Sequence, residues 1–223
     1  YHSVLVARLS GLLNRYATVV TWQHRENFKT DLRQKLIGLT NFLSDRVIAD
    51  SEPAAEMYRQ AFGLDSKFVR TVPIAGIQLD DFPVKHHQPK ETVVVGSVGR
   101  LVPPKNYATL VEIAEKLSGS NLEFRIAGDG PERCNLEQMV ENKTLGNIEF
   151  IGGVQDVPDF LSTLDIYVQP SHSEGLCMTV IEAMAIGLPI VGSNVGGIGR
   201  NVQHGNCGFL YEPEQVDKFV YGI

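Results

Sequence analysis

The sequence predicts an α/β protein built on parallel sheets and divided into two domains. Short apolar segments alternate with amphipathic helical segments along the 223 residues, which is typical of parallel strands joined by helical crossovers. Thr92–Val98 is a run rich in β-branched residues, of the kind that a parallel sheet buries on both faces. Between residues 73 and 89 this pattern breaks, and prolines and other turn-forming residues gather. We therefore expect one domain over residues 1–89, linker included, and a second over residues 90–223.

The first domain is expected to alternate helices and strands from its first residues. Ser51 is a natural N-cap, and Pro53 fits the first turn of a helix that ends near Gly63. In chain order we expect a helix over 2–15, a strand over 17–22, a helix over 29–43, a strand over 46–49, the helix that follows Ser51, and a strand over 68–72.

The second domain continues the alternation more regularly. Gly187 fits a helix C-cap, and Pro189 fits the start of the strand that follows. The expected strands are 92–98, 123–127, 147–151, 166–169 and the segment that starts at 189, and the expected helices are 106–117, 133–141, 158–164 and 179–186.

Charge and cysteine content exclude several classes of function. The formal net charge is −6, which argues against nucleic acid as a partner. The three cysteines are odd in number and form no CxxC pair, so neither a disulfide scaffold nor a zinc site is expected, and a reducing cytoplasm fits. We find no membrane span and no signal peptide.

The charge is unevenly distributed. Residues 1–50 carry seven Lys or Arg against four Asp or Glu. A basic face there could contact anionic lipid or a phosphorylated acceptor, and a solvated helix face is the alternative. Its residues are Arg25, Lys29, Arg33 and Lys35.

The first candidate site follows the strand 92–98. Arg100 and Lys105 lie on one loop at the carboxyl end of that strand, where open α/β sheets bind ligands. Both cations could converge on a diphosphate. Two surface cations beside a turn are the alternative.

The second candidate site lies between the strand 166–169 and the helix 179–186. Backbone amides from Gly175 to Thr179, Met178 among them, would point out of the helix N-terminus and form an anion site. Glu174 precedes this helix, and Glu182 lies inside it among apolar residues, where a carboxylate without a partner is costly. A capping Glu174 and a salt-bridged Glu182 are the alternatives.

Two glycine-rich turns accompany these sites. Gly128-Asp129-Gly130-Pro131 follows the strand 123–127, and a second glycine-dense loop spans 192–199. Both could be plain turns, or could expose amides to an anion. Neither completes the glycine fingerprint of nicotinamide-binding proteins.

The order and spacing of these segments resemble the family 4 retaining glycosyltransferases of the GT-B class, which have two facing Rossmann-like domains. The matching stretches are GRLVPPKN, AGDGPER and EGLCMTVIEAMAIGLPIVGSNVGGI, with looser likeness in TWQHREN and DRVIADSE. Glu174 and Glu182 match the family's paired glutamates. The resemblance implies a C-terminal nucleotide-sugar domain and a partial acceptor domain before it.

The resemblance also implies roles for single residues. Arg100 and Lys105 would hold the diphosphate of a UDP- or GDP-sugar, Glu174 would bind the transferred sugar, and Glu182 would bind the ribose. The remaining implied contacts are amides near Gly175, Met178 and Thr179 with phosphate, Gly153 and Val154 beside the base, and His24 from the other domain beside the donor sugar.

The implied reaction is hexosyl transfer with retention of configuration to a glycan, lipid or small acceptor. The sequence contains no DxD motif, and Arg100, Lys105 and a helix N-terminus could neutralise the leaving diphosphate. We therefore expect neither a metal nor a cofactor. A cytoplasmic protein, with peripheral membrane contact through the N-terminal part, fits this reaction.

Two departures from the family pattern stand out. Gly199-Arg200 replaces an acidic residue that often follows the double glycine. The leading strands of the acceptor domain and the closing helices have no counterpart, so we expect a chain shortened at both ends that binds nucleotide but turns over poorly alone. The alternatives are a non-catalytic nucleotide-sugar-binding subunit and a nucleotide-sugar epimerase of the same fold.

Overall fold

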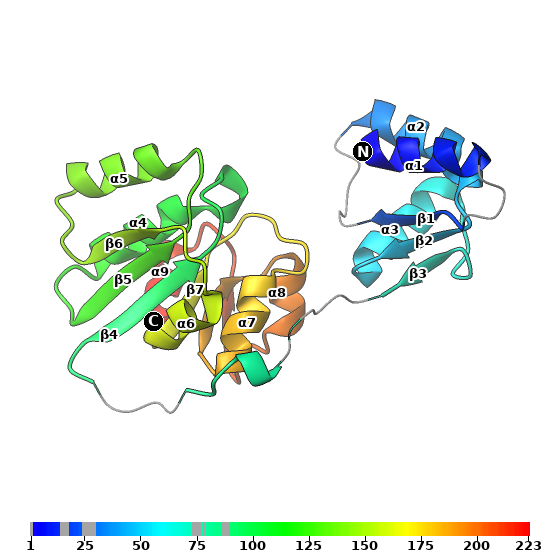
Figure 1. Ribbon diagram of the computed structural model, residues 1–223. Coiled ribbons are helices and arrows are strands. Elements are labelled where there is room, and N and C mark those ends of the chain that lie inside the picture. The colour runs from blue at the N-terminus through cyan, green and yellow to red at the C-terminus, as the bar shows by residue number, and fades with distance from the viewer. Residues whose placement is uncertain (1, 14–17, 24–29, 73–76, 78, 86–89) are drawn as a thin grey trace. The chain divides into compact units, whose positions relative to one another are not determined.

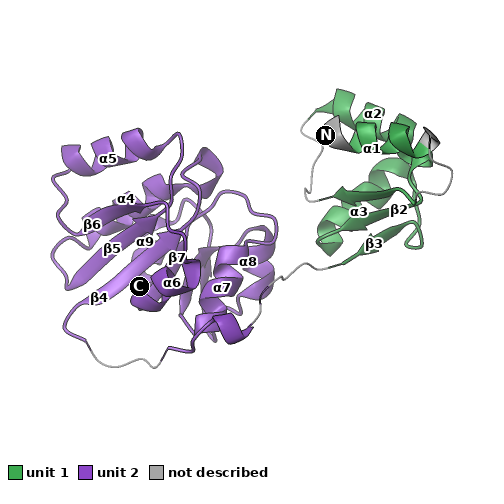
Figure 2. Cartoon of the chain, in the orientation of Figure 1, with its two compact units in different colours: residues 1–74 green, residues 75–223 purple. Residues whose placement is uncertain are grey.

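The chain folds into two compact units, residues 1–74 and 75–223, which Figure 2 colours green and purple. The structure, a computed structural model, describes residues 2–13, 18–23, 30–72, 77, 79–85 and 90–223 (Figure 1). Each unit contains a parallel sheet with helices packed on it. The expected α/β class is confirmed.

The described residues of unit 1 form a three-stranded parallel sheet in the order β1-β2-β3 and three α-helices. Ser51 precedes α3 in an extended conformation, and Gly63 ends this helix with φ 63°, as the sequence predicts. The core consists of Val47, Ala49, Ala54, Ala55, Tyr58 and Val69. The elements are α1 (His2–Leu13), β1 (Val20–Gln23), α2 (Asp31–Thr40), the 3₁₀ helix η1 (Asn41–Leu43), β2 (Arg46–Ala49), α3 (Glu52–Phe62) and β3 (Val69–Thr71).

The side chain of Arg8 on α1 ties the elements of unit 1 together. Arg8 is fully buried. Its guanidinium donates to the Oγ of Ser44 at 2.8 Å, the Oδ1 of Asn41 at 2.9 Å, and the hydroxyl of Tyr58 at 3.1 Å. It also donates to the hydroxyls of Thr21 and Thr40 and to the Ile37 carbonyl. All these acceptors are neutral, so among the described residues hydrogen bonds rather than a carboxylate compensate the buried charge.

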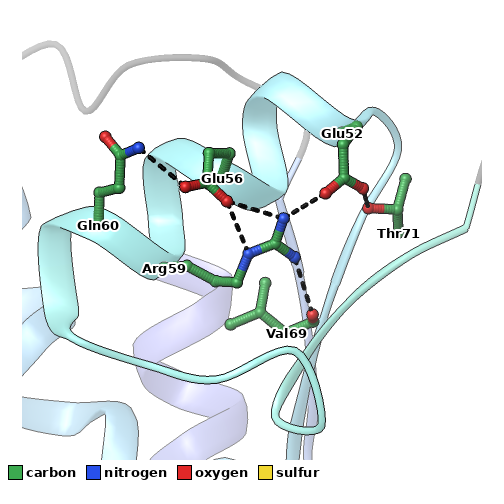
Figure 3. Close-up of polar contacts among 6 residues, drawn as sticks. All are labelled: Glu52, Glu56, Arg59, Gln60, Val69 and Thr71. Atoms are coloured by element: carbon green, nitrogen blue, oxygen red, sulfur yellow. Dashed lines mark hydrogen bonds and ion pairs between the residues drawn. The ribbon is translucent and has the colours of Figure 1, made fainter.

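A cluster of charged side chains joins α3 to β3 (Figure 3). Arg59 pairs with Glu52 and with Glu56, the latter at 2.9 Å, and donates to the Val69 carbonyl at 3.3 Å. The hydroxyl of Thr71 donates to Glu52, and this bond, followed by the one from Arg59, lowers the pKa of Glu52. Because both carboxylates are exposed, such pairs contribute little to stability.

Unit 2 contains a six-stranded parallel sheet in the order β6-β5-β4-β7-β8-β9. The strands are β4 (Val93–Val98), β5 (Leu122–Ala127), β6 (Ile148–Gly152), β7 (Ile166–Gln169), β8 (Ile190–Ser193) and β9 (Gly208–Tyr211). The helices are α4 (Tyr107–Lys116), α5 (Arg133–Asn142), α6 (Val157–Thr163), α7 (Met178–Ile186), α8 (Gly196–Asn201) and α9 (Val216–Gly222), with the 3₁₀ helices η2 (Leu79–Asp81) and η3 (Pro103–Lys105).

Helices cover both faces of this sheet. Val94 and Val98 of β4 face a core that α6, α7 and α8 close, whereas Val95 faces a core that α4, α5 and α9 close. Figure 1 shows α6, α7 and α8 together on one side of the strands. Strands buried on both faces explain why the strand sequences read as nearly continuous apolar runs.

The boundary between the units lies after residue 74, not near residue 90 as the sequence suggests. Phe82 belongs to the buried core of unit 2, and Ile77 packs against that core. The amide of Lys85 donates to the carbonyl of Ile186 at 2.8 Å. The segment expected to be a linker is therefore, as far as the structure describes it, part of unit 2.

Asp165 fixes the end of this segment to the sheet. Its carboxylate pairs with Lys85 at 2.9 Å and with Lys90 at 2.7 Å, and accepts from the Val94 amide at 3.0 Å. Burial acts to raise the pKa of Asp165, but the hydrogen bonds from Lys90, Val94 and Lys85 together lower it to about 2. The carboxylate therefore stays ionised at neutral pH.

Three elements near the C-terminus were not expected: α8, β9 and α9. The glycine-dense loop predicted over 192–199 contains the end of β8 and the first turns of α8. Its glycines have low helix propensity, and α8 instead depends on Ile198, which is fully buried against β8. Tertiary packing decides the structure here.

Replacing the buried guanidinium tests the role of Arg8. We expect Arg8→Met to destabilise unit 1 by about 3 kcal/mol or more, because hydroxyl and amide acceptors are left buried without a donor. Trp22 on β1 is the single tryptophan of the sequence, so its fluorescence during urea unfolding reports on unit 1. Arg46→Met on the exposed side of β2 is the matched control, and equal stability of the two variants would contradict the prediction.

Candidate functional site

The direction of the strand connections in unit 2 reverses between β4 and β7. When the six strands are numbered by their place in the chain, their order across the sheet is 3-2-1-4-5-6, so the chain leaves β4 toward one edge of the sheet and β7 toward the other. Open α/β sheets bind ligands at this switch point, beyond the carboxyl ends of the strands. Two loops start there, which we name the Lys105 loop (residues 99–106) and the Glu174 loop (residues 170–177).

Lys105 and Glu174 meet across this switch point. The Nζ of Lys105 lies 2.7 Å from the Oε1 of Glu174, and their side chains are only 19% and 9% exposed. The hydroxyl of Ser171 donates to the same carboxylate oxygen at 2.7 Å. An ion pair so little exposed to water is stronger than one on the surface. The structure thus brings together one cation and one acid that the sequence assigned to separate loops.

Hydrogen bonds to backbone carbonyls join the two loops to each other. The side-chain amide of Asn106 donates to the Pro170 carbonyl at 3.0 Å, and the His172 amide donates to the Pro104 carbonyl at 2.9 Å. Asn106 adopts a left-handed conformation, with φ 54°, as the 3₁₀ helix η3 ends and α4 begins. The position of Lys105 therefore follows from the turn that connects η3 to α4.

The glycine-rich turn at the start of α8 supports the Glu174 loop from the other side. The amide of Gly197 donates to the Gly175 carbonyl at 2.6 Å, and Arg200 donates to that carbonyl at 3.2 Å. A Cβ on Gly196 would lie 1.8 Å from the carbonyl oxygen of Glu174, and one on Gly197 would lie 2.1 Å from that of Leu176. These glycines are needed for close backbone contact, and Arg200 has a structural role that the sequence did not indicate.

The turn after β5 packs in the same way against the Lys105 loop. A Cβ on Gly128 would lie 2.0 Å from the Gly99 carbonyl oxygen, and one on Gly130 would lie 2.2 Å from that of Leu101. The Leu101 amide donates to the carbonyl of Asp129 at 2.9 Å. Both glycine turns thus lie beside the site and shape its loops.

The N-terminus of α7 follows directly after the Glu174 loop. The first-turn amides of a helix, here those of Met178 and Thr179, have no acceptor within the helix and favour an anion. Cys177 precedes them with φ 54°, and burial, followed by the nearby charge of Glu174, raises the pKa of its thiol to about 12. Cys177 is therefore a neutral packing residue rather than a nucleophile.

Glu182 lies on α7 four residues after Met178, on the same side of the helix. Its carboxylate is half-buried, and burial raises its pKa. Within the part of the chain that the structure describes, Glu182 has no hydrogen-bond or ion-pair partner. A half-buried carboxylate without a partner is a candidate acceptor for ligand hydroxyls.

The other expected site residues are distributed more widely. Arg100 is exposed, and none of the described residues pairs with its guanidinium. Gly153 and Val154 follow β6, two strands away from β4 at the same sheet edge. No contact joins them to the Lys105–Glu174 pair among the described residues. His24 lies outside the described residues.

Sequence reasoning missed the side chains beneath Glu174. Tyr167, Gln169 and Ser171 are fully buried and linked by hydrogen bonds that end at the Glu174 carboxylate. The signal was present in the sequence, because a glutamine inside an apolar strand requires buried partners. In the ranges that the structure describes, no three His, Cys, Asp or Glu residues group as metal ligands would.

A cavity with a mainly apolar lining lies elsewhere. Its volume is about 510 Å³, and its lining includes Ile166, Ile190 and Gly208, the first residues of β7, β8 and β9. It therefore lies at the opposite edge of the sheet from Lys105 and Glu174, and offers no charged group for chemistry.

Comparison with known proteins gives consistent matches. A family model described as glycosyl transferases group 1 matches residues 80–223. An uncharacterized glycosyltransferase of Haemophilus influenzae is 27% identical over 99% of this chain and 63% of its own length. The GPI3 subunit of the phosphatidylinositol N-acetylglucosaminyltransferase of Saccharomyces cerevisiae is 32% identical over 74% of this chain and 39% of its own length. The chain therefore spans less than two thirds of the length of these relatives.

Solved structures resemble the chain in fold. The crystal structure of Anabaena HepE in complex with UDP and glucose matches with a TM-score of 0.86 and 20% identity, over 99% of this chain and 64% of that one. Sucrose-phosphate synthase from Thermosynechococcus elongatus matches with a TM-score of 0.80 and 22% identity, over 98% of this chain and 61% of that one.

The glycine contacts beneath the Glu174 loop lead to a testable prediction. We expect Gly197→Ala to destabilise unit 2 by about 2 to 3 kcal/mol, because the new methyl group overlaps a backbone carbonyl that cannot move aside freely. Gly119→Ala, where nothing lies within 4 Å of the new Cβ, is the control. Urea unfolding followed by circular dichroism compares the two, and a Gly197→Ala variant as stable as its control would refute the steric argument.

Proposed function

The chain belongs to the glycosyl transferases of group 1 and has the GT-B fold, and on this basis we propose that unit 2 binds the donor of a sugar-transfer reaction. The observation that carries the proposal is the Lys105–Glu174 pair at the switch point of the sheet. The proposed donor is a nucleoside-diphosphate sugar, and the proposed reaction is hexosyl transfer with retention of configuration. The complexes of HepE with UDP and with UDP-glucose make a UDP-sugar the first donor to test.

In the proposed site, cationic groups bind the phosphates of the donor. Departure of a nucleoside diphosphate builds negative charge, which fixed donors and cations must stabilise. Lys105 is held at the switch point, and the first-turn amides of α7, at Met178 and Thr179, add partial positive charge. Exposed Arg100 is free to turn toward the diphosphate, because it has no partner among the described residues. These groups supply the neutralisation without a metal ion in the proposed reaction.

In the same proposal, two glutamate carboxylates bind the transferred sugar and the ribose of the donor. Glu174 accepts hydrogen bonds from hydroxyls of the transferred sugar, and Glu182 accepts them from the ribose. The half-buried carboxylate of Glu182 fits such a role, since hydroxyl donors would stabilise its ionised form. On the sequence resemblance alone, the proposal also assigns Gly153 and Val154 to the base and His24 to the donor sugar.

A peripheral membrane contact through unit 1 is a further part of the proposal. Leu32, Leu39 and Phe42 are 68%, 72% and 80% exposed, and with Lys35 they recur at helical spacing along α2 and η1. An exposed apolar stripe with a lysine favours the surface of an anionic bilayer. No helix in the described ranges is long and apolar enough to cross a membrane.

Nucleotide binding tests the proposed function directly. We expect the chain to bind UDP or GDP, and Lys105→Ala to weaken that binding about tenfold or more, because a charge-assisted contact with the diphosphate is lost. Calorimetry with UDP, GDP and the corresponding monophosphates measures this. Lys116→Ala, which removes a surface lysine paired with Asp217 in the same unit, is the control. A wild-type chain that binds neither UDP nor GDP would overturn the proposed function.

The membrane contact predicts a separate result. Wild-type chain should sediment with vesicles that contain phosphatidylserine, and a Leu39→Ser/Phe42→Ser double variant should lose most of this binding because its apolar stripe is interrupted. Tyr221→Ser, at an 85% exposed residue of unit 2, is the control. Undiminished sedimentation of the double variant would argue against α2 as the contact.

A further inference from the structure

A chain of hydrogen bonds runs from the interior of the sheet to the Glu174 carboxylate. The Tyr167 hydroxyl lies 2.8 Å from the Oε1 of Gln169, and the Nε2 of Gln169 lies 2.9 Å from the Oγ of Ser171. The Oγ of Ser171 lies 2.7 Å from the Oε1 of Glu174. Tyr167, Gln169 and Ser171 are all fully buried. Water therefore does not compete for these bonds.

Donor and acceptor types set the direction of these bonds. An amide oxygen only accepts, so the Tyr167 hydroxyl donates to Gln169 at 2.8 Å, with the Val98 carbonyl at 3.2 Å as a second, longer acceptor. An amide nitrogen only donates, so Gln169 donates to Ser171. The Ser171 hydroxyl has a single proton, and with its oxygen engaged by Gln169 that proton points to Glu174. The result is a hydroxyl held in the orientation that binds the carboxylate.

The two oxygens of Glu174 are treated differently by the protein. Oε1 binds both Lys105 and Ser171. Oε2 has no partner within the part of the chain that the structure describes. One oxygen is thus anchored by two groups, and the other is not engaged by any of the described residues.

We propose that Ser171, oriented by Gln169 and Tyr167, is a positioning residue that holds Glu174 for the sugar of the donor. The inference rests on the proposed function of unit 2. When Lys105 turns to a diphosphate, its contact with Oε1 weakens, and Ser171 is the anchor that stays. The carboxylate then keeps Oε2 directed at a sugar hydroxyl instead of rotating toward the cation.

The cost of burying these groups supports a functional reason for them. Strand β7 is buried on both faces, where apolar side chains would pack equally well without any need for partners. A polar chain in such a place is stable only when each member is satisfied. Tyr167 also bonds the backbone of Val98, whereas Gln169 and Ser171 carry the chain on to Glu174. Packing alone does not account for Tyr167 and Gln169 together.

The test separates the sugar contact from the phosphate contact. We expect Ser171→Ala to bind UDP and GDP within about twofold of wild type, and to bind UDP-glucose or GDP-mannose about five- to tenfold more weakly. Calorimetry on the full 223-residue chain measures both sets. Ser162→Ala removes an exposed hydroxyl whose one partner among the described residues is the carbonyl of Asp159, and should change neither.

A second variant covers the case in which Ser171→Ala does not fold. Gln169→Met keeps Ser171 but leaves the Ser171 hydroxyl free to rotate. We therefore expect weaker binding of nucleotide sugars than of diphosphates, as in Ser171→Ala, but with a smaller difference. If the variant that folds loses affinity equally for diphosphates and nucleotide sugars, or loses none for either, the inference is overturned while the proposed function of unit 2 stands. Failure of wild type to bind any of these ligands would instead overturn the proposed function and the inference with it.

Discussion

The reversal of strand order between β4 and β7 is the constraint on which the site depends. Neighbouring parallel strands whose crossovers leave in opposite directions cannot cover the sheet edge between them. The loops that start at this point must be held by other means. Here Asn106 and the amide of His172 join the two loops to each other, and the turns at Gly128 and Gly197 support them from the outer strands. The Lys105–Glu174 pair is a consequence of that scaffold.

The buried charged side chains of the two units differ in their interactions. The guanidinium of Arg8 is fully buried and donates to hydroxyls and carbonyls from most elements of unit 1, so it has a structural role. Glu174 is nearly as buried, yet only one of its oxygens is engaged by the described residues. Glu182 is half-buried, and burial raises its pKa. A saturated buried charge holds a fold together, whereas a partly satisfied one is suited to bind a ligand.

Sequence patterns predicted the strands and helix ends that depend on residues close together in the chain. The strands expected from side-chain periodicity all form, and β9 alone among the described strands was not expected. Ser51 and Gly187 take the expected N-cap and C-cap positions, although the Ser51 side chain makes no capping hydrogen bond. The loops that bear Lys105 and Glu174 were found because parallel strands share a carboxyl edge. The predictions that were wrong concern features that depend on contacts between residues far apart in the sequence. Phe82 joins a core formed mainly by residues much later in the chain, and α8 forms although its first residues are glycines.

The ion pair at the switch point also couples the two halves of the proposed donor. Without ligand, Lys105 and Glu174 neutralise each other, so a phosphate that attracts Lys105 leaves a carboxylate with less compensation. A sugar hydroxyl bound to that carboxylate offsets the loss. A ligand that carries both groups therefore binds with less penalty than either group alone. In the proposed site, selectivity for an intact nucleotide sugar would follow from this exchange, in which Lys105 and Glu174 give up their contact with each other for one contact each with the ligand.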